Sequence, residues 1–169
     1  MTCEASVYPL TSVELNIELN MESIELKDFI RTYRQATLAV SADNEPSTAM
    51  VSYAQHGGGL LIHLSNLSQH KRLLMANPKC SLLIAEPDDG RAEVMSLARV
   101  TLNGSAIKLS KATQEYEDAK AAFLAKLPTS EVMFGLADFD LFRIVPSSGR
   151  FIAGFGRAFA LSTDDLLTL

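Results

Sequence analysis

Residues 60–73 contain a change of pattern that restricts the fold more than any other part of the chain. An apolar run over residues 60–64 ends at Ser65, and a polar, serine-rich turn then leads into His70-Lys71-Arg72. The run predicts a strand, and the basic triplet opens a helical pattern that extends over residues 68–76. Helix starts have unpaired N–H groups that suit a phosphate, although polar residues there also serve as ordinary caps. Both interpretations, an anion site and plain capping, remain open.

Short β-prone segments separated by turn residues account for most of the remaining chain. Residues 13–21 alternate apolar and polar side chains, which predicts either an edge strand or an arm that pairs with a second subunit. Asn103-Gly104 is expected to form a bulge or turn, and residues 146–149 a turn between the last two strands. Helices are expected over 22–34, 68–76 and 110–127, and further strands over 37–41, 48–55, 60–65, 80–85, 92–109 (one bent strand or a pair), 136–145 and 150–161.

This order of elements predicts an α+β chain that is mostly β. Six or more antiparallel strands with helices inserted between them favour a small β-barrel with two or three decorating helices. No internal repeat, low-complexity tract or linker divides the 169 residues. A single domain is therefore expected over 1–169, with an N-terminal extension (1–22), a core (23–160) and a short tail (161–169).

Composition excludes several classes of function. The net charge of −5 argues against nucleic-acid or anionic-membrane binding, and no apolar run approaches the roughly 20 residues of a membrane span. The N-terminus lacks the pattern of a secretory signal, and Cys3 and Cys80 fit reduced thiols, so a cytoplasmic protein is expected. No cluster has metal-ligand spacing, and no nucleophile stands in a recognisable elbow. Redox chemistry, where present, would belong to a cofactor.

Five segments, in their order along the chain, resemble a known family. They are Glu45-Pro46 leading to Ser52-Tyr53-Ala54, then residues 65–72, then Asn77-Pro78 with Ser81-Leu82, then residues 99–104, and finally residues 141–158. The first four are similar to the FMN-binding split barrel of the pyridoxamine-phosphate-oxidase-like superfamily. The last is similar to its haem-utilisation (HugZ/HutZ-type) branch. The resemblance covers about residues 23–160.

The resemblance implies a homodimeric FMN-binding flavoprotein, with sites at the subunit interface and oxidoreductase activity on a small molecule. A dianionic phosphate would be held by hydroxyl and basic side chains, and the flavin ring would lie along residues 46–53. Arg99 and Tyr53 also have plain interpretations, as a solvated barrel residue and a core residue. The cofactor contacts that the resemblance implies are Pro46, Ser52, Tyr53, Ser65, His70, Lys71, Arg72 and Arg99.

Haem is the alternative ligand, because the haem-degrading relatives hold iron through a C-terminal histidine. This chain departs from that pattern: its histidines are His56, His63 and His70. Haem degradation is therefore not expected, although Arg157 could pair with a propionate or a phosphate, or be a simple turn cation. His63, inside the apolar run, is expected to be a satisfied barrel residue. A second alternative is a split-barrel dimer that binds a ligand without catalysis.

Overall fold

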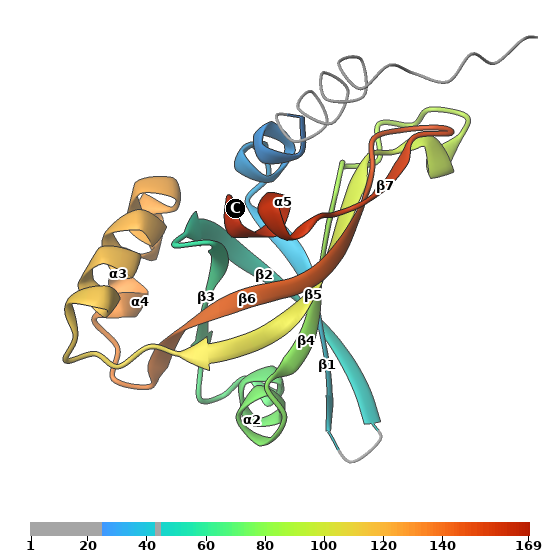
Figure 1. Cartoon of the computed structure of the whole chain (residues 1–169). Helices are drawn as coiled ribbons and strands as arrows, with labels where there is room; N and C mark the ends of the chain where they lie inside the picture. Colours follow the sequence, from blue (N-terminus) through green and yellow to red (C-terminus); the bar gives the residue numbers. More distant parts are fainter. Residues whose placement is uncertain (1–24, 43–44) are drawn as a thin grey trace, which may run out of the picture.

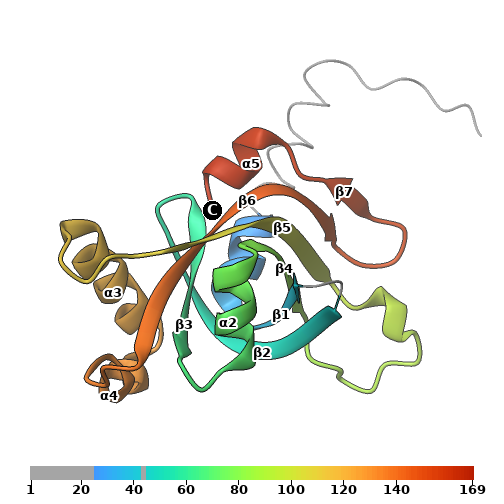
Figure 2. The same ribbon diagram turned by 90° about the horizontal axis from the view of Figure 1, so that it is seen from below.

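Six antiparallel strands close into a barrel in the computed structural model, which describes residues 25–42 and 45–169 (Figures 1 and 2). The sheet order is β3-β2-β1-β4-β5-β6, and pairing of β6 with β3 closes it, while β7 extends the sheet beyond β6. The expected split barrel is confirmed. The alternating segment 13–21 lies outside the described residues. The strands are β1 (Gln35–Ala42), β2 (Glu45–His56), β3 (Gly59–Ser65), β4 (Lys79–Ala85), β5 (Arg99–Lys108), β6 (Phe139–Ile152) and β7 (Ala158–Ala160).

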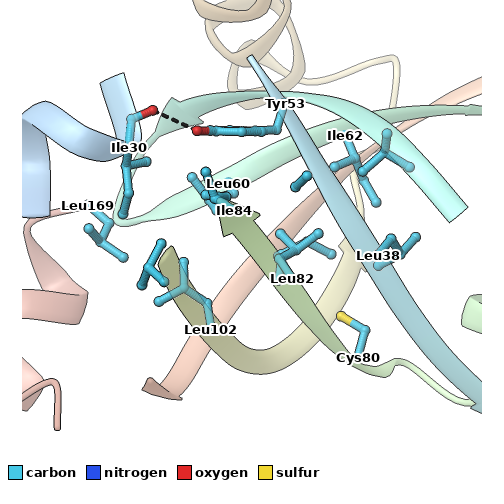
Figure 3. Packing of buried hydrophobic residues seen from close by; sticks show 14 of the residues in the cluster. Ile30, Leu38, Tyr53, Leu60, Ile62, Cys80, Leu82, Ile84, Leu102 and Leu169 are labelled. Carbon is cyan, nitrogen blue, oxygen red and sulfur yellow. Dashed lines mark hydrogen bonds between the residues drawn. The ribbon is translucent and has the colours of Figure 1, made fainter. Parts of the chain in front are cut away.

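Period-two patterns in these strands place the apolar side chains inside the barrel. In β1, Ala36, Leu38 and Val40 are buried, while the residues between them are less buried or exposed. Leucine and isoleucine side chains from β1, β3, β4, β5 and β6 fill the interior around Tyr53 of β2, whose hydroxyl donates a 2.8 Å hydrogen bond to the carbonyl of Ile30 (Figure 3). The core therefore joins the strands to the helix at residues 25–32.

Helices close both ends of the barrel (Figures 1 and 2). The helical residues 25–32 and α5 (Thr163–Leu167) lie at one end, and α2 (Gln69–Ala76) lies across the other. A capping box between Ser162 and Asp165 starts α5, and Leu166 and Leu169 enter the barrel core. Residues 161–169, expected as a short tail, thus contain a helix that packs against the strands.

A second apolar cluster lies between the outside of the barrel and α3 (Gln114–Lys126). The hydroxyl of Thr113 accepts a hydrogen bond from the Tyr116 N–H and caps this helix, so the helix expected from residue 110 begins four residues later. A 3-10 turn, η2 (Pro128–Ser130), and α4 (Glu131–Phe134) follow. The cluster consists of Ala54, Leu61, Leu109, Tyr116, Ala119, Phe123, Leu127 and Leu141.

Two sequence predictions about the later strands are wrong. Residues 146–149 do not form a turn, because β6 runs unbroken from Phe139 to Ile152 with a bulge opposite Asn103 and Gly104. The bulge expected at Asn103-Gly104 is confirmed. Residues 92–98 are a loop with a 3-10 turn, η1 (Val94–Ser96), so the strand expected from residue 92 begins at Arg99. The described residues hold five α-helices, whereas two or three were expected. The additional helices are α4 and α5, which are too short to give a helical pattern in the sequence.

Candidate functional site

The connection from β3 to α2 is held against Asp138, the residue immediately before β6. Ser65 donates its hydroxyl to a carboxylate oxygen of Asp138 at 2.5 Å, and the Asn66 N–H donates to the Asp138 carbonyl at 2.9 Å. The Ser68 N–H turns back to the carbonyl of Ser65 at 3.0 Å, and α2 starts one residue later. The expected strand-to-helix connection is therefore confirmed, with β6 as its support.

Lys71 points into the protein and its ammonium group is fully engaged there. Only 5% of the residue is exposed. Its Nζ lies 2.7 Å from a carboxylate oxygen of Asp140, 2.6 Å from the side-chain oxygen of Asn66 and 3.1 Å from the carbonyl of Asp138. An ammonium group has three donors, and these contacts use all of them. Lys71 thus holds α2 against β6, where the sequence suggested a phosphate ligand.

Asp140 is shared between two lysines. The carboxylate oxygen that Lys71 contacts also lies 2.7 Å from Nζ of Lys108 at the end of β5. Burial would raise the pKa of Asp140, but the hydrogen bonds from Lys108 and Lys71 outweigh it, so the pKa lies below its usual value. Asp140 is therefore ionised at neutral pH, and the cluster keeps one carboxylate between two cations.

His70 lies on the other side of α2, against β2. Its Nε2 is 3.0 Å from the carbonyl of Thr48, which requires Nε2 to carry a proton and donate it. In the neutral ring Nδ1 then keeps its lone pair, and its contact is the hydroxyl of Ser68 at 3.3 Å. The half-buried ring is thus oriented, with one nitrogen able to accept or to ligate. Arg72, two residues after His70, is exposed on α2.

The residues expected around a flavin ring do not share one environment. Ser52 is exposed on β2, whereas Tyr53 is completely buried and its hydroxyl is bonded to Ile30. Burial raises the pKa of Tyr53 above its usual value. Its side chain therefore packs in the core and is not presented to a ligand at the surface of this subunit.

Pro46 lines an open groove of about 530 Å³ on the outside of the barrel. Asn77, Ser81, Asn103 and Gly104 also line it. These residues come from three of the segments that carried the family resemblance, so the fold brings those segments together at one surface.

Arg99 and Arg157 lie away from the β3–α2 connection. Arg99 is at the start of β5, and Lys108 at the end of the same strand contacts Asp140, which gives a separation of up to about 30 Å along the strand. The guanidinium of Arg99 donates to the carbonyls of Met95 and Leu97. Arg157 pairs with Glu25 at 2.8 Å. Of the expected phosphate ligands, Ser65, His70, Lys71 and Arg72 lie at the β3–α2 connection of one subunit. Arg99 and Arg157 of the same subunit do not reach it.

Sequence reasoning did not connect Lys108, Asn66 and Thr48 with this site. Lys108 acts through Asp140, which is far along the chain, and Thr48 acts through its backbone carbonyl, so no local pattern marks either of them. Asn66 acts through Lys71, five residues later, whose inward orientation the sequence does not reveal. Asp138 and Asp140 also belong to this site. Their position at the start of an apolar strand was the available signal, and the structure shows both of them in contact with the β3–α2 connection.

His63 is a barrel histidine without the expected hydrogen bonds. Its ring stacks on Phe134 of α4, with centroids 3.9 Å apart and planes inclined by 14°, and it also lies near Phe139 and Phe123. Neither ring nitrogen has a partner within the described part of the chain. Burial, aided by the nearby charge of Lys111, lowers the pKa of His63 to about 4. The ring is thus a neutral aromatic surface under α4.

Two further classes of site were sought in residues 25–42 and 45–169. No helix there is both long and apolar enough to cross a membrane. Within the same residues, no group of three or more His, Cys, Asp or Glu side chains is arranged to hold a metal ion.

Comparison with known proteins decides the family. The model of the family pyridoxamine 5'-phosphate oxidase matches residues 23–153. The chain belongs to this family. Within the pyridoxamine 5'-phosphate oxidase family it belongs to the haem-utilisation branch, as its relatives show.

Two curated relatives and one solved structure define that branch. The chain is 28% identical over 147 residues to haem oxygenase HutZ of Vibrio cholerae, covering 85% of this chain and 82% of HutZ. It is 36% identical over 126 residues to the chloroplastic non-canonical haem oxygenase HOZ of Arabidopsis thaliana, covering 73% of this chain but only 37% of HOZ. A haem-binding protein from Mycobacterium smegmatis matches with a TM-score of 0.73 at 25% identity, over 83% of this chain and 59% of that one.

Replacing Lys71 with Ala should destabilise the fold, because Asp140 and Asn66 lose a buried partner. We expect the free energy of unfolding, measured by urea titration, to fall by about 3 kcal/mol. Arg72→Ala is the matched control, since Arg72 is exposed on the same helix, and it should change stability by less than about 0.5 kcal/mol. Equal stability of the two variants would contradict the assigned role of Lys71.

His63 should make stability depend on pH in mildly acidic solution. Its pKa is about 4 in the folded protein and near 6.5 when unfolded, so below pH 6.5 the unfolded chain binds a proton that the folded chain does not. Stability should therefore be complete above pH 6.5 and fall towards pH 4, by up to about 1.4 kcal/mol per pH unit. Urea titrations at several pH values of wild type and His63→Phe test this. The difference between the two should be constant above pH 7 and should change with pH below pH 6.5, and parallel curves over the whole range would refute the assignment.

Proposed function

We propose that this protein binds haem, and that His70 is its nitrogen donor to the iron. The oriented imidazole of His70 at the β3–α2 connection is the observation that supports this most directly. Membership of the haem-utilisation branch supports the choice of ligand, because HutZ and HOZ are named as haem oxygenases and the M. smegmatis relative as a haem-binding protein.

The three histidines of the chain differ in how available they are. His63 is enclosed by three phenylalanine rings, so its nitrogens cannot reach a large planar ligand while α4 is in place. His56 lies near the β2–β3 turn, outside the β3–α2 connection. His70 has a fixed ring and a lone pair on Nδ1 whose 3.3 Å contact with the Ser68 hydroxyl is long and therefore easily replaced. Haem would supply the iron chemistry, and His70 would orient it.

FMN has weaker support as the ligand. The family name favours a flavin, but a dianionic phosphate needs several charge-assisted donors. Lys71 is committed to Asp140, and Arg99 and Arg157 bond to groups elsewhere, so His70 and Arg72 are what remains of the expected set near α2. An FMN-dependent oxidoreductase is accordingly our second candidate, and a non-catalytic ligand-binding dimer the third.

We infer further that two subunits associate through the outer face of β2, β1, β4 and β5. Met50, Thr37, Leu83 and Thr101 form one row across these strands, and Met50 and Leu83 remain 75% and 38% exposed. Exposed large apolar side chains such as Met50 and Leu83, set among threonines on an open sheet face, support an interaction surface. Thr48, whose carbonyl accepts from His70, belongs to the next row, so a partner on this face would lie beside the proposed haem site.

The dimer can be tested by sedimentation equilibrium. Wild type should have twice the monomer mass, and Leu83→Lys, which introduces a charge into the row, should sediment as a monomer that retains its fold. Leu167→Lys is the control, because Leu167 is exposed on α5, remote from this face. A wild-type protein that stays monomeric at every concentration would refute the inference.

Haem binding can be tested by titration with haemin. Wild type should develop a Soret band with one haem per subunit, and His70→Ala should weaken binding at least about tenfold, equivalent to about 1.4 kcal/mol, with a shifted Soret maximum. His56→Ala is the matched control and should bind as wild type does. Flavin absorbance that survives gel filtration, combined with no Soret band, would instead favour the FMN candidate.

Ring opening is a separate question from binding. The relatives' names favour it, whereas no histidine follows His70 in this chain. We expect the haem complex, incubated with ascorbate and oxygen, to keep its Soret band without forming a biliverdin-like pigment. Steady loss of that band, unaffected by catalase and abolished in His70→Ala, would show instead that haem is a substrate.

A further inference from the structure

A second cavity lies at the end of the barrel that α2 closes, away from His70. It has a volume of about 430 Å³ and is lined by Lys108, Leu109, Ser110, Lys111 and Asp140. These residues come from the end of β5, the segment after it and the start of β6. Two lysines and one hydroxyl therefore face a single carboxylate across a space large enough for a small ion with its water.

The charges around this cavity are unbalanced in favour of cations. Asp140 is the only carboxylate that lines it, and the buried Lys71 already neutralises that group from the protein side. Lys108 contacts the same carboxylate oxygen, but its side chain is 45% exposed, whereas that of Lys71 is 6% exposed. Asp138, two residues before Asp140, accepts the hydroxyl of Ser65. The cavity is therefore positively charged, although the chain as a whole has a net charge of −5.

The donors that line the cavity are available to a ligand. Within the described residues, Nζ of Lys111 makes no hydrogen bond or ion pair, and the hydroxyl of Ser110 donates no hydrogen bond. Because Lys71 keeps Asp140 paired, Lys108 can also turn towards an anion without leaving a buried charge alone. Exchanging one exposed ion pair for another costs little.

We propose that this cavity is a binding site for a small oxyanion, held by the ammonium groups of Lys108 and Lys111 and the hydroxyl of Ser110. The chemistry fits either a free phosphate or a carboxylate group of a larger ligand, such as a haem propionate. The first source is independent of the proposed haem function, and the second rests on it.

The test uses the full-length protein and inorganic phosphate at low ionic strength, where screening is weak. Binding is followed by backbone amide chemical shifts, and wild type should show saturable shifts confined to residues 108–111 and 140. Lys111→Gln removes a charge that has no internal partner, so the fold should survive, and the affinity should fall at least about fivefold. Lys79→Gln is the control, since Lys79 is exposed in the other groove, and it should bind phosphate as wild type does.

A competition experiment separates the two sources of oxyanion. Haemin should displace phosphate if a propionate occupies the cavity, and the dimethyl ester of haemin should then fail to do so. If neither displaces it, free phosphate is the ligand. The proposal is overturned if phosphate causes no saturable shifts at residues 108–111 and Lys111→Gln leaves haemin affinity unchanged. It is also overturned if Lys79→Gln weakens phosphate binding as much as Lys111→Gln does.

Discussion

The barrel depends on one long strand that pairs along both edges. β6 pairs with β3 over residues 139–144 and with β5 over residues 142–152, so its middle residues bond to both neighbours. A twisted sheet of six strands leaves two exposed edges unless one strand joins them. The bulge near Ser147 lets β6 bend and continue past Pro146, which interrupts the ladder where pairing is already irregular. Without that continuity Asp138 and Asp140 would not face α2.

Closure by β6 also explains why the β3–α2 connection is polar. α2 lies across the end of the barrel and has two buried residues, Leu74 and Lys71. The leucine packs into the core, while the lysine reaches Asp138, just before β6, and Asp140, its second residue. Burying a charge is unfavourable unless it is paired and hydrogen-bonded, and the contacts with Asp140, Asn66 and Asp138 meet that requirement. Placing Lys71 inward turns His70, one residue earlier, towards β2 and its outer face.

The sequence was sufficient to locate most strands and helices along the chain, because alternation and turn residues are local signals. It was insufficient at two kinds of place. Pro146–Gly149 has the composition of a turn, yet its conformation is set by pairing with residues more than forty positions earlier. Lys71 was expected to bind a phosphate, yet it is buried against Asp140, a residue that only the closed barrel brings near. The same reason applies to Tyr53, whose hydroxyl finds its acceptor in the helix at residues 25–32.

Our proposal of haem over FMN rests on how this chain uses its cations. A flavin phosphate requires positive groups that are free to bind it, whereas haem iron can be held by a single oriented imidazole. Lys71 is committed to Asp140, Arg157 to Glu25 and Arg99 to backbone carbonyls. Among the sequence-derived ligands near α2, His70 keeps a lone pair in a fixed ring. A branch of the family could therefore change its ligand from flavin to haem and keep the same barrel. Its cations would be paired internally, and one imidazole would be retained beside the proposed subunit interface.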